Sequence, residues 1–186
     1  MLEARPDLHS REFAPMSADQ LRSILDRITG ARVLVLGDYC LDIYWFIDSN
    51  RSEKSLETGL MTNPVREQRY SLGGAGNVVN NVVAAGCRDV RALGVVGDDP
   101  WGHQMIRLLQ ASGVHTDDLL VQRENWATLA YNKPHVEKQE GNRFDFGNFN
   151  ELSPQTARSG KTYQHRSRLR SLCRLSLRGC PAALLR

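Results

Sequence analysis

The 186 residues are 41% hydrophobic, 24% charged and 7% aromatic, which fits one soluble domain with a core, or a domain with a small lid. The net charge of +3 is uneven, because residues 158–186 hold eight Lys and Arg and no acid, so residues 1–157 have a net charge of −5. No apolar run reaches the roughly 18 residues that span a bilayer. There is also no apolar signal-peptide core and no metal-binding cysteine spacing, so we predict a cytoplasmic, reduced protein.

The basic tail raises the question of an anionic partner. Lys and Arg without acids can bind nucleic acid or an anionic membrane. The segment 158–186 contains a single aromatic residue, Tyr163, and no nucleic-acid motif. A solvated tail explains the same charges, so we expect neither a nucleic-acid nor a membrane partner.

The first half of the chain predicts a helix, a buried strand and an excursion. Residues 1–16 show no periodicity and are predicted to be a flexible arm. A capping box at Ser17 begins a helix with apolar residues at helical spacing, and Gly30 ends it. Residues 32–37 form a short apolar run of the buried parallel type. Segments 43–47 and 65–72 favour strands, and we interpret 43–72 as a lid that leaves the main sheet.

The next elements repeat a strand–helix pattern. A glycine-rich turn at 73–76 opens a helix that Gly86 closes, and 90–96 is a second buried strand. Asp99 as N-cap with Pro100 in the first turn opens another helix, and 127–133 is predicted to be a strand. Strand, helix, strand, helix indicates an α/β domain on a mainly parallel sheet.

The segment Gly73-Gly74-Ala75-Gly76-Asn77 is the most informative motif. Glycines at a helix entrance let a ligand approach free backbone N–H groups, and Asn77 adds a donor and an acceptor. The alternative is a tight turn whose glycines serve packing. The dinucleotide fingerprint fails here because it requires a glycine at Val79.

Two carboxylates, Asp38 and Asp42, follow the first strand. Ligands of open α/β sheets bind beyond the carboxyl ends of the strands, where two carboxylates could accept hydrogen bonds from adjacent sugar hydroxyls. The alternative is one turn aspartate and one solvated aspartate. The pair Asp98-Asp99 is better explained by helix capping than by metal binding. The scattered histidines form no ligand pair, so no metal site and no catalytic residue are predicted.

Taken together, these segments resemble the ribokinase-like PfkB family of carbohydrate kinases. The resemblance covers about residues 30–157, in the family's order, including the lid that interrupts the first βαβ unit. The Gly-Asp-x-x-x-Asp form at 37–42 and the Arg-Phe-Asp-Phe segment at 143–146 look most like the heptose 7-phosphate kinase branch. The implied fold is α/β and ribokinase-like, with a mainly parallel sheet, flanking helices and a small β lid.

The resemblance also implies a site, a reaction and partners. The sugar or sugar phosphate would be held by six residues, Asp38, Asp42, Gly73, Gly74, Gly76 and Asn77. Three more candidates, Lys133, Arg143 and Asp145, lie near the lid. ATP and Mg²⁺ are the family's cofactors, and a homodimer through the lid is a further implied partner.

Two departures concern spacing. Ten residues separate Gly86 from Gly97, where the family usually has nine, and Val79 replaces a small residue. An extra residue in a turn is tolerable.

A third departure concerns the carboxyl-terminal part. Family members carry a Gly-Ala-Gly-Asp segment that forms an anion hole and supplies the catalytic base, and this sequence has none. We therefore expect a truncated domain: 17–157 as the amino-terminal substrate-binding part, with lid strands within 43–72 and 127–145. The segment 158–186 would be an atypical tail without the family's fold, whose composition suggests a frame-shifted reading.

Two functions follow as hypotheses. The first is a sugar kinase, of which this chain is an inactive substrate-binding fragment lacking the ATP site. The second is a non-catalytic sugar-binding or regulatory module that never needs ATP.

Overall fold

The computed structural model describes residues 15–166 and 172–176, and its first element is the helix predicted after Ser17. In α1 (Ala18–Thr29), the Ser17 hydroxyl accepts from the Gln20 N–H, while the Gln20 side chain accepts from the Ser17 N–H. This reciprocal capping box confirms the predicted start of the helix. The predicted arm falls almost wholly outside the described residues.

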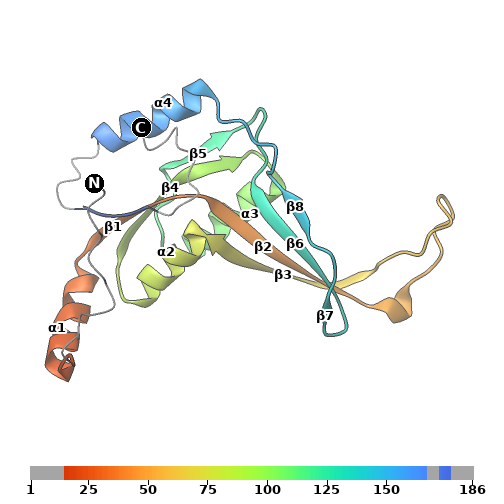
Figure 1. Ribbon diagram of the computed structural model, residues 1–186, viewed down its shortest axis with the longest axis horizontal. Helices are drawn as coiled ribbons and strands as arrows, with labels where there is room; N and C mark the ends of the chain where they lie inside the picture. Colours follow the sequence, from red (N-terminus) through yellow and green to blue (C-terminus); the bar gives the residue numbers. More distant parts are fainter. Residues whose placement is uncertain (1–14, 167–171, 177–186) are drawn as a thin grey trace, which may run out of the picture.

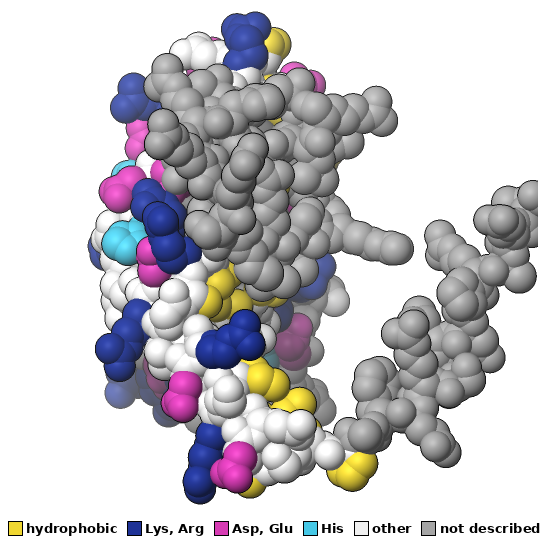
Figure 2. Space-filling view, turned by 90° about the vertical axis from the view of Figure 1, so that its left-hand side faces the viewer, with side chains coloured by type: hydrophobic (Ala, Val, Ile, Leu, Met, Phe, Trp, Pro, Cys, Tyr) yellow, Lys and Arg dark blue, Asp and Glu magenta, His cyan; other side chains and the backbone are white. Residues whose placement is uncertain are grey.

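One side of α1 is apolar and stays open to solvent. No residue of the helix is buried, and hydrophobic side chains show on the lower part of the face in Figure 2, where α1 lies. The exposed apolar residues are Met16, Leu21, Ile24 and Leu25. Only the last turn, through Ile28, packs against the core.

The main sheet contains four parallel strands in the order β5-β4-β1-β9 (Figure 1). They are β1 (Arg32–Leu36), β4 (Asp89–Gly97), β5 (Leu119–Gln122) and β9 (Leu172–Ser176). The predicted parallel pairing of the first two buried strands is confirmed, since Val33 pairs with Val90 and Leu36 with Leu93. After their first residues, both strands are continuously buried, from Val33 to Leu36 and from Ala92 to Gly97, which is typical of strands covered on both faces.

A second sheet forms the lid and extends away from the main sheet in Figure 1. Its order is β3-β2-β6-β7, with β8 also paired to β6. The strands are β2 (Tyr39–Ile47), β3 (Val65–Gly74), β6 (Leu129–Val136), β7 (Gln139–Glu140) and β8 (Phe144–Phe146), with a 3₁₀ turn, η2 (Ser49–Arg51), after β2. β2 and β6 run parallel, whereas β3 and β8 are antiparallel to their neighbours.

The first lid strand begins four residues earlier than the predicted Ile43. The reason is the corner at Tyr39, whose buried hydroxyl donates to the Val35 carbonyl at 2.9 Å and turns the chain directly from β1 into β2. β6 begins later than predicted, because the backbone N–H groups of Ala127 and Thr128 donate to side chains, not to a neighbouring strand.

Two helices, α2 (Ala75–Ala84) and α3 (Pro100–Ala111), lie on one side of the main sheet, and α4 (Pro154–Arg166) lies on the other (Figure 1). Asp99 caps α3 as predicted, accepting from the Gly102 N–H at 2.8 Å. Side chains from α2, α3 and both sheets share one buried cluster, which includes Leu41, Ile43, Val79, Val96, Met105 and Leu109. This shared core fixes the lid to the main sheet at its base.

The carboxyl-terminal region contains two elements that the sequence did not predict. α4 begins where Ser153 accepts from the Thr156 N–H, and β9 adds a parallel strand to β1. The predicted boundary between domain and tail at residue 158 therefore falls inside a helix, although the assignment of 158–186 as an atypical tail stays a prediction. Within the described part of the chain, no helix has the length and apolarity to cross a bilayer.

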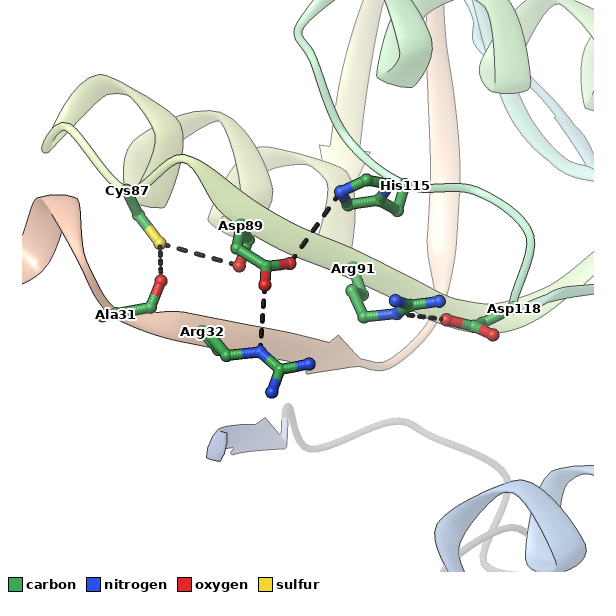
Figure 3. A network of polar contacts seen from close by, with 7 residues as sticks. All are labelled: Ala31, Arg32, Cys87, Asp89, Arg91, His115 and Asp118. Carbon is green, nitrogen blue, oxygen red and sulfur yellow. Dashed lines mark hydrogen bonds and ion pairs between the residues drawn. The ribbon is translucent and has the colours of Figure 1, made fainter. Parts of the chain in front are cut away.

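Ion pairs link charged side chains at the amino-terminal ends of the main-sheet strands (Figure 3). Arg32 at the start of β1 donates to Asp89 at the start of β4, at 3.0 Å, and His115 lies 3.9 Å from the other oxygen of Asp89. Arg91 and the buried Asp118 form a second ion pair at 2.8 Å. These contacts lie at the ends of the strands opposite to the turn that carries Asp38, and they leave the carboxyl ends for the candidate site.

Candidate functional site

Two carboxylates mark the junction of the main sheet and the lid. Asp38 lies in the turn between β1 and β2, as predicted, and Asp42 lies inside β2, not in a loop just past the first strand. Cys40 lies between them on the same face of the strand, because side chains two residues apart share a face. Burial raises the pKa of the half-buried Asp38 to about 6 and that of the Cys40 thiol to about 11, the nearby Asp42 contributing to the latter. The thiol therefore stays protonated near neutral pH.

The glycines at the end of β3 lie directly against this face. Gly73 pairs with Cys40 across the ladder, and a Cβ at Gly73 would lie 2.6 Å from the Cys40 sulfur and 3.1 Å from Asp42 Oδ2. At Gly74, with φ +55°, a Cβ would lie 2.4 Å from the Asp38 carbonyl oxygen. Only glycine allows these contacts, so the end of β3 packs closely against Cys40, Asp42 and the Asp38 backbone, with Gly73 buried and Gly74 exposed.

The same turn opens α2. The Ala75 N–H donates to the Asp38 carbonyl at 2.9 Å, and Gly74 provides no side-chain cap for the helix. Asn77 lies exposed in the first turn, where a polar side chain can meet a ligand. Gly76 is buried, and a Cβ there would lie 2.9 Å from the Leu72 side chain, so its role is helix–strand packing. The packing alternative therefore applies to Gly76 and to the buried Gly73, whereas Gly74 leaves exposed backbone in the turn next to Asp38.

Lys133 reaches Asp42 from the neighbouring strand β6. Its Nζ lies 2.8 Å from Asp42 Oδ1 and 5.1 Å from the centre of the Tyr44 ring. The two side chains are only 19% and 21% exposed. Burial alone would lower the pKa of Lys133, but the contacts with Asp42 and Tyr44 outweigh it and raise the pKa above its ordinary value. The ammonium group therefore remains charged at any physiological pH.

A second ion pair lies one strand further along. Arg143 donates twice to Asp145, at 2.5 and 2.7 Å, and its guanidinium lies 4.5 Å from the centre of the Tyr131 ring. Tyr131 is in register with Asp42 on one side and with Asp145 on the other. The two pairs therefore share one face of the lid sheet, with Tyr131 between them.

The structure thus brings most of the predicted site residues onto one face. The sequence analysis missed three residues there: Cys40, Tyr44 and Tyr131. Cys40 and Tyr44 flank Asp42 at two-residue spacing, and this alternation was the available signal. The face offers carboxylate acceptors, glycine backbone and two paired cations, a set suited to hydroxyl-rich ligands. Among the described residues, no group of His, Cys, Asp or Glu side chains could hold a metal ion.

A separate hollow of about 690 Å³ lies between β5 and the first turn of α4. It is lined by Gln122, Arg123, Ser153, Gln155 and Arg158, among others, and by none of the residues of the face described above. Gln122 bridges its wall, donating to the Glu151 carbonyl and accepting from the Ser153 N–H. These contacts anchor the chain before α4, which is a structural role.

Comparisons with known proteins identify the family of the chain. The family model described as pfkB family carbohydrate kinase matches residues 32–165. A D-beta-D-heptose 7-phosphate kinase of Bordetella bronchiseptica is 43% identical over 104 residues, which are 56% of this chain and 32% of that protein. A bifunctional protein HldE of Pelobacter propionicus is 38% identical over 57% of this chain and 21% of its own length. The chain therefore spans a third or less of these relatives.

Solved structures show the same fold at low sequence identity. A Staphylococcus aureus protein provisionally assigned as a phosphofructokinase has a TM-score of 0.57 and 15% identity, covering 81% of this chain and 45% of that one. A Clostridium perfringens protein provisionally assigned as a sugar kinase has a TM-score of 0.51 and 19% identity, covering 72% and 40%.

Proposed function

The chain belongs to the pfkB family of carbohydrate kinases and has the ribokinase-like α/β fold with a β lid that its sequence predicts, and from this we propose that it binds a sugar or sugar phosphate as the substrate-binding part of an ATP-dependent sugar kinase. The observation that supports this is the position of Asp42 Oδ2 beside Gly73, next to the exposed Gly74 that packs against the Asp38 backbone. Two carboxylates near an exposed glycine turn match the adjacent hydroxyls of a sugar.

In this proposal, each residue has a distinct task. Asp38 and Asp42 accept hydrogen bonds from sugar hydroxyls, each worth about 1.5–3 kcal/mol because the acceptor is charged. Gly73 lets β3 pack against Asp42, the exposed backbone at Gly74 allows close approach, and Asn77 donates and accepts at the start of α2. Gly76 supports the turn by packing closely against the Leu72 side chain. Lys133, Arg143 and Asp145 border the site on the lid.

Phosphoryl transfer needs more than this site. The reaction forms a bond between a sugar oxygen and the γ-phosphorus of ATP, breaks the bond to ADP, and passes the hydroxyl proton to a base, with Mg²⁺ neutralising charge. The 186 residues contain no Gly-Ala-Gly-Asp segment, and the described residues fit no metal ion. We therefore assign no residue to ATP, Mg²⁺ or the base, and we propose that this chain alone does not turn over.

The second candidate is a non-catalytic sugar-binding or regulatory module, and the same lack of an ATP segment favours it. Isothermal calorimetry with D-heptose 7-phosphate, with and without ATP, separates the two. A substrate-binding part binds the sugar, and its affinity rises when the missing part of the domain is supplied together with ATP. A module that never needs ATP shows the same affinity throughout. If the chain binds no sugar, or if its sugar affinity does not change in Asp42→Asn, both candidates are refuted.

The proposed partners extend this function. A second copy is the proposed partner of the lid, because Leu60, Met61 and Val65 leave exposed apolar surface next to the edge strand β3. Sedimentation of the wild type and of Leu60→Ser with Met61→Ser tests this, since a lid dimer should dissociate in the double variant. We propose a cytoplasmic location, with no nucleic-acid or membrane partner.

A further inference from the structure

The contacts of Lys133 separate it from the other residues of the proposed sugar site. Its ammonium group touches Asp42 Oδ1 at 2.8 Å and lies over the Tyr44 ring, and the side chain is only 19% exposed. Both contacts are to β2, while Lys133 itself lies on β6. The ammonium group therefore contacts two side chains of β2, and little of its surface is open to a ligand.

The two oxygens of Asp42 have different surroundings as a result. Oδ1 accepts from Lys133, whereas Oδ2 lies over Gly73, 3.1 Å from where a Cβ would be. A carboxylate held by one oxygen keeps a fixed orientation, and the other oxygen then points in a defined direction. Here that oxygen lies beside the buried Gly73, next to the exposed Gly74 turn that the proposed sugar approaches.

We propose that Lys133 is a positioning residue, which acts on the sugar through Asp42 by fixing the carboxylate so that Oδ2 is the acceptor presented beside Gly73. This inference rests on the proposed sugar-binding function. It assigns the acceptor to one oxygen, and it places Lys133 behind the site instead of on the ligand. The permanent charge of the ammonium, whose pKa the two β2 contacts raise, suits this task.

Register supports the assignment. Asp42 pairs with Tyr131 across the β2–β6 ladder, and Lys133 pairs with Tyr44. The ion pair is therefore diagonal across one step of the sheet, a separation of about 7–8 Å between backbones that only a long side chain can bridge. Arginine at 133 can also span it, whereas methionine retains the length and packing but not the charge.

The test is a double-mutant cycle on sugar affinity, measured by calorimetry on the full chain with D-heptose 7-phosphate and with the same heptose lacking the phosphate. We expect Lys133→Met to weaken both ligands about tenfold, and Lys133→Arg to restore affinity to within about threefold of the wild type. In an Asp42→Asn background, Lys133→Met should change affinity less than twofold. Lys138→Met, at an exposed lysine in the turn after β6, is the matched control and should leave affinity unchanged.

The outcomes separate the inference from the function. If the wild type binds neither ligand, the proposed function fails and the inference fails with it. If the wild type binds but Lys133→Met still costs tenfold in the Asp42→Asn background, the inference is overturned and the function stands. A loss confined to the phosphorylated heptose would likewise overturn it, because it would place Lys133 on the phosphate.

Discussion

Replacing Asp38 by asparagine should change how the stability of this protein depends on pH. Burial raises the pKa of Asp38 from its ordinary value of 3.8 to about 6. A raised pKa means that the folded state holds its proton more tightly than the unfolded chain does. The contribution of Asp38 to stability is therefore fully present below pH 3.8 and is lost as the pH rises through about 6. The Asp38→Asn variant does not lose stability in this way, because the asparagine side chain does not ionise.

The magnitude follows from that difference. Raising a carboxyl pKa from 3.8 to about 6 on folding corresponds to a change of about 3 kcal/mol in the free energy of unfolding when no solvent screening is counted. Asp38 is only half-buried, and water around it screens the effect, so we expect about 1–1.5 kcal/mol. The Asp38→Asn variant should gain this amount relative to the wild type between about pH 4 and pH 7.5.

Urea denaturation of both proteins at several pH values measures the gain. The wild type and the variant should differ least near pH 4 and most above pH 7. Asp26→Asn, at an exposed aspartate in α1, is the control for the loss of one carboxylate elsewhere on the protein. A constant difference for Asp38→Asn would show that Asp38 is ordinary and solvated, and our interpretation of the site would lose its buried carboxyl.

Two further substitutions test the backbone and the core. Gly74→Ala should cost about 3 kcal/mol or more, because positive φ and a contact of 2.4 Å with the Asp38 carbonyl act together. Gly113→Ala, also at positive φ but with no atom within 4 Å of the added Cβ, should cost only about 1–2 kcal/mol. If urea denaturation gives equal losses for the two variants, the close contact at Gly74 is contradicted. Asn132→Val should raise stability by about 1–2 kcal/mol, since the buried amide has no hydrogen-bond partner within the described residues. A loss of stability would instead reveal a partner for that amide.

Two strands of the main sheet and the starts of two helices could be predicted because their signals are local. The buried run at 32–37, the capping box at Ser17 and the Asp99–Pro100 helix start each occupy a few consecutive residues, and the structure contains all three. Short-range geometry decides such elements. Pairing between the first two strands followed from the strand–helix alternation and was confirmed.

The lid was harder, since its strands are held by partners distant in sequence. β8 has only three residues and exists because Ala130 and Asn132 pair with Phe146 and Phe144. In the main sheet, β5 was missed for a similar reason, since it has four residues and pairs only with β4 among the described strands. Segments this short have no periodicity to detect. The predicted start of β2 was wrong because the chain turns at Tyr39, whose buried hydroxyl donates to the Val35 carbonyl four residues earlier, and no strand pattern signals that contact.

The candidate site also contains residues that the sequence predicted and contacts that it could not predict. Its carboxylates and glycines could be named from the sequence because they follow a strand and open a helix. The Lys133–Asp42 pair could not, because it depends on parallel pairing of β2 with β6 and on the diagonal register between them. Sequence analysis placed Lys133 near the lid, and only the register identifies its partner.

The surroundings of the two carboxylates lead to a last prediction, that sugar binding releases a proton near pH 6. Asp42 has Lys133 at 2.8 Å, whereas Asp38 is held by burial and keeps part of its proton up to about pH 6. Sugar hydroxyls that donate to Asp38 favour its charged form and lower its pKa, so binding between about pH 5 and 6.5 must expel the proton. Calorimetry in buffers with different ionisation enthalpies should give about 0.5–0.8 protons released at pH 5.5 and close to none at pH 7.5. The release should disappear in Asp38→Asn and persist in Asn77→Ala, provided that binding is still measurable. Proton uptake, or release that survives in Asp38→Asn, would mean that the sugar does not donate to Asp38, and the ligand would then have to lie on the Asp42 side of the glycine turn alone.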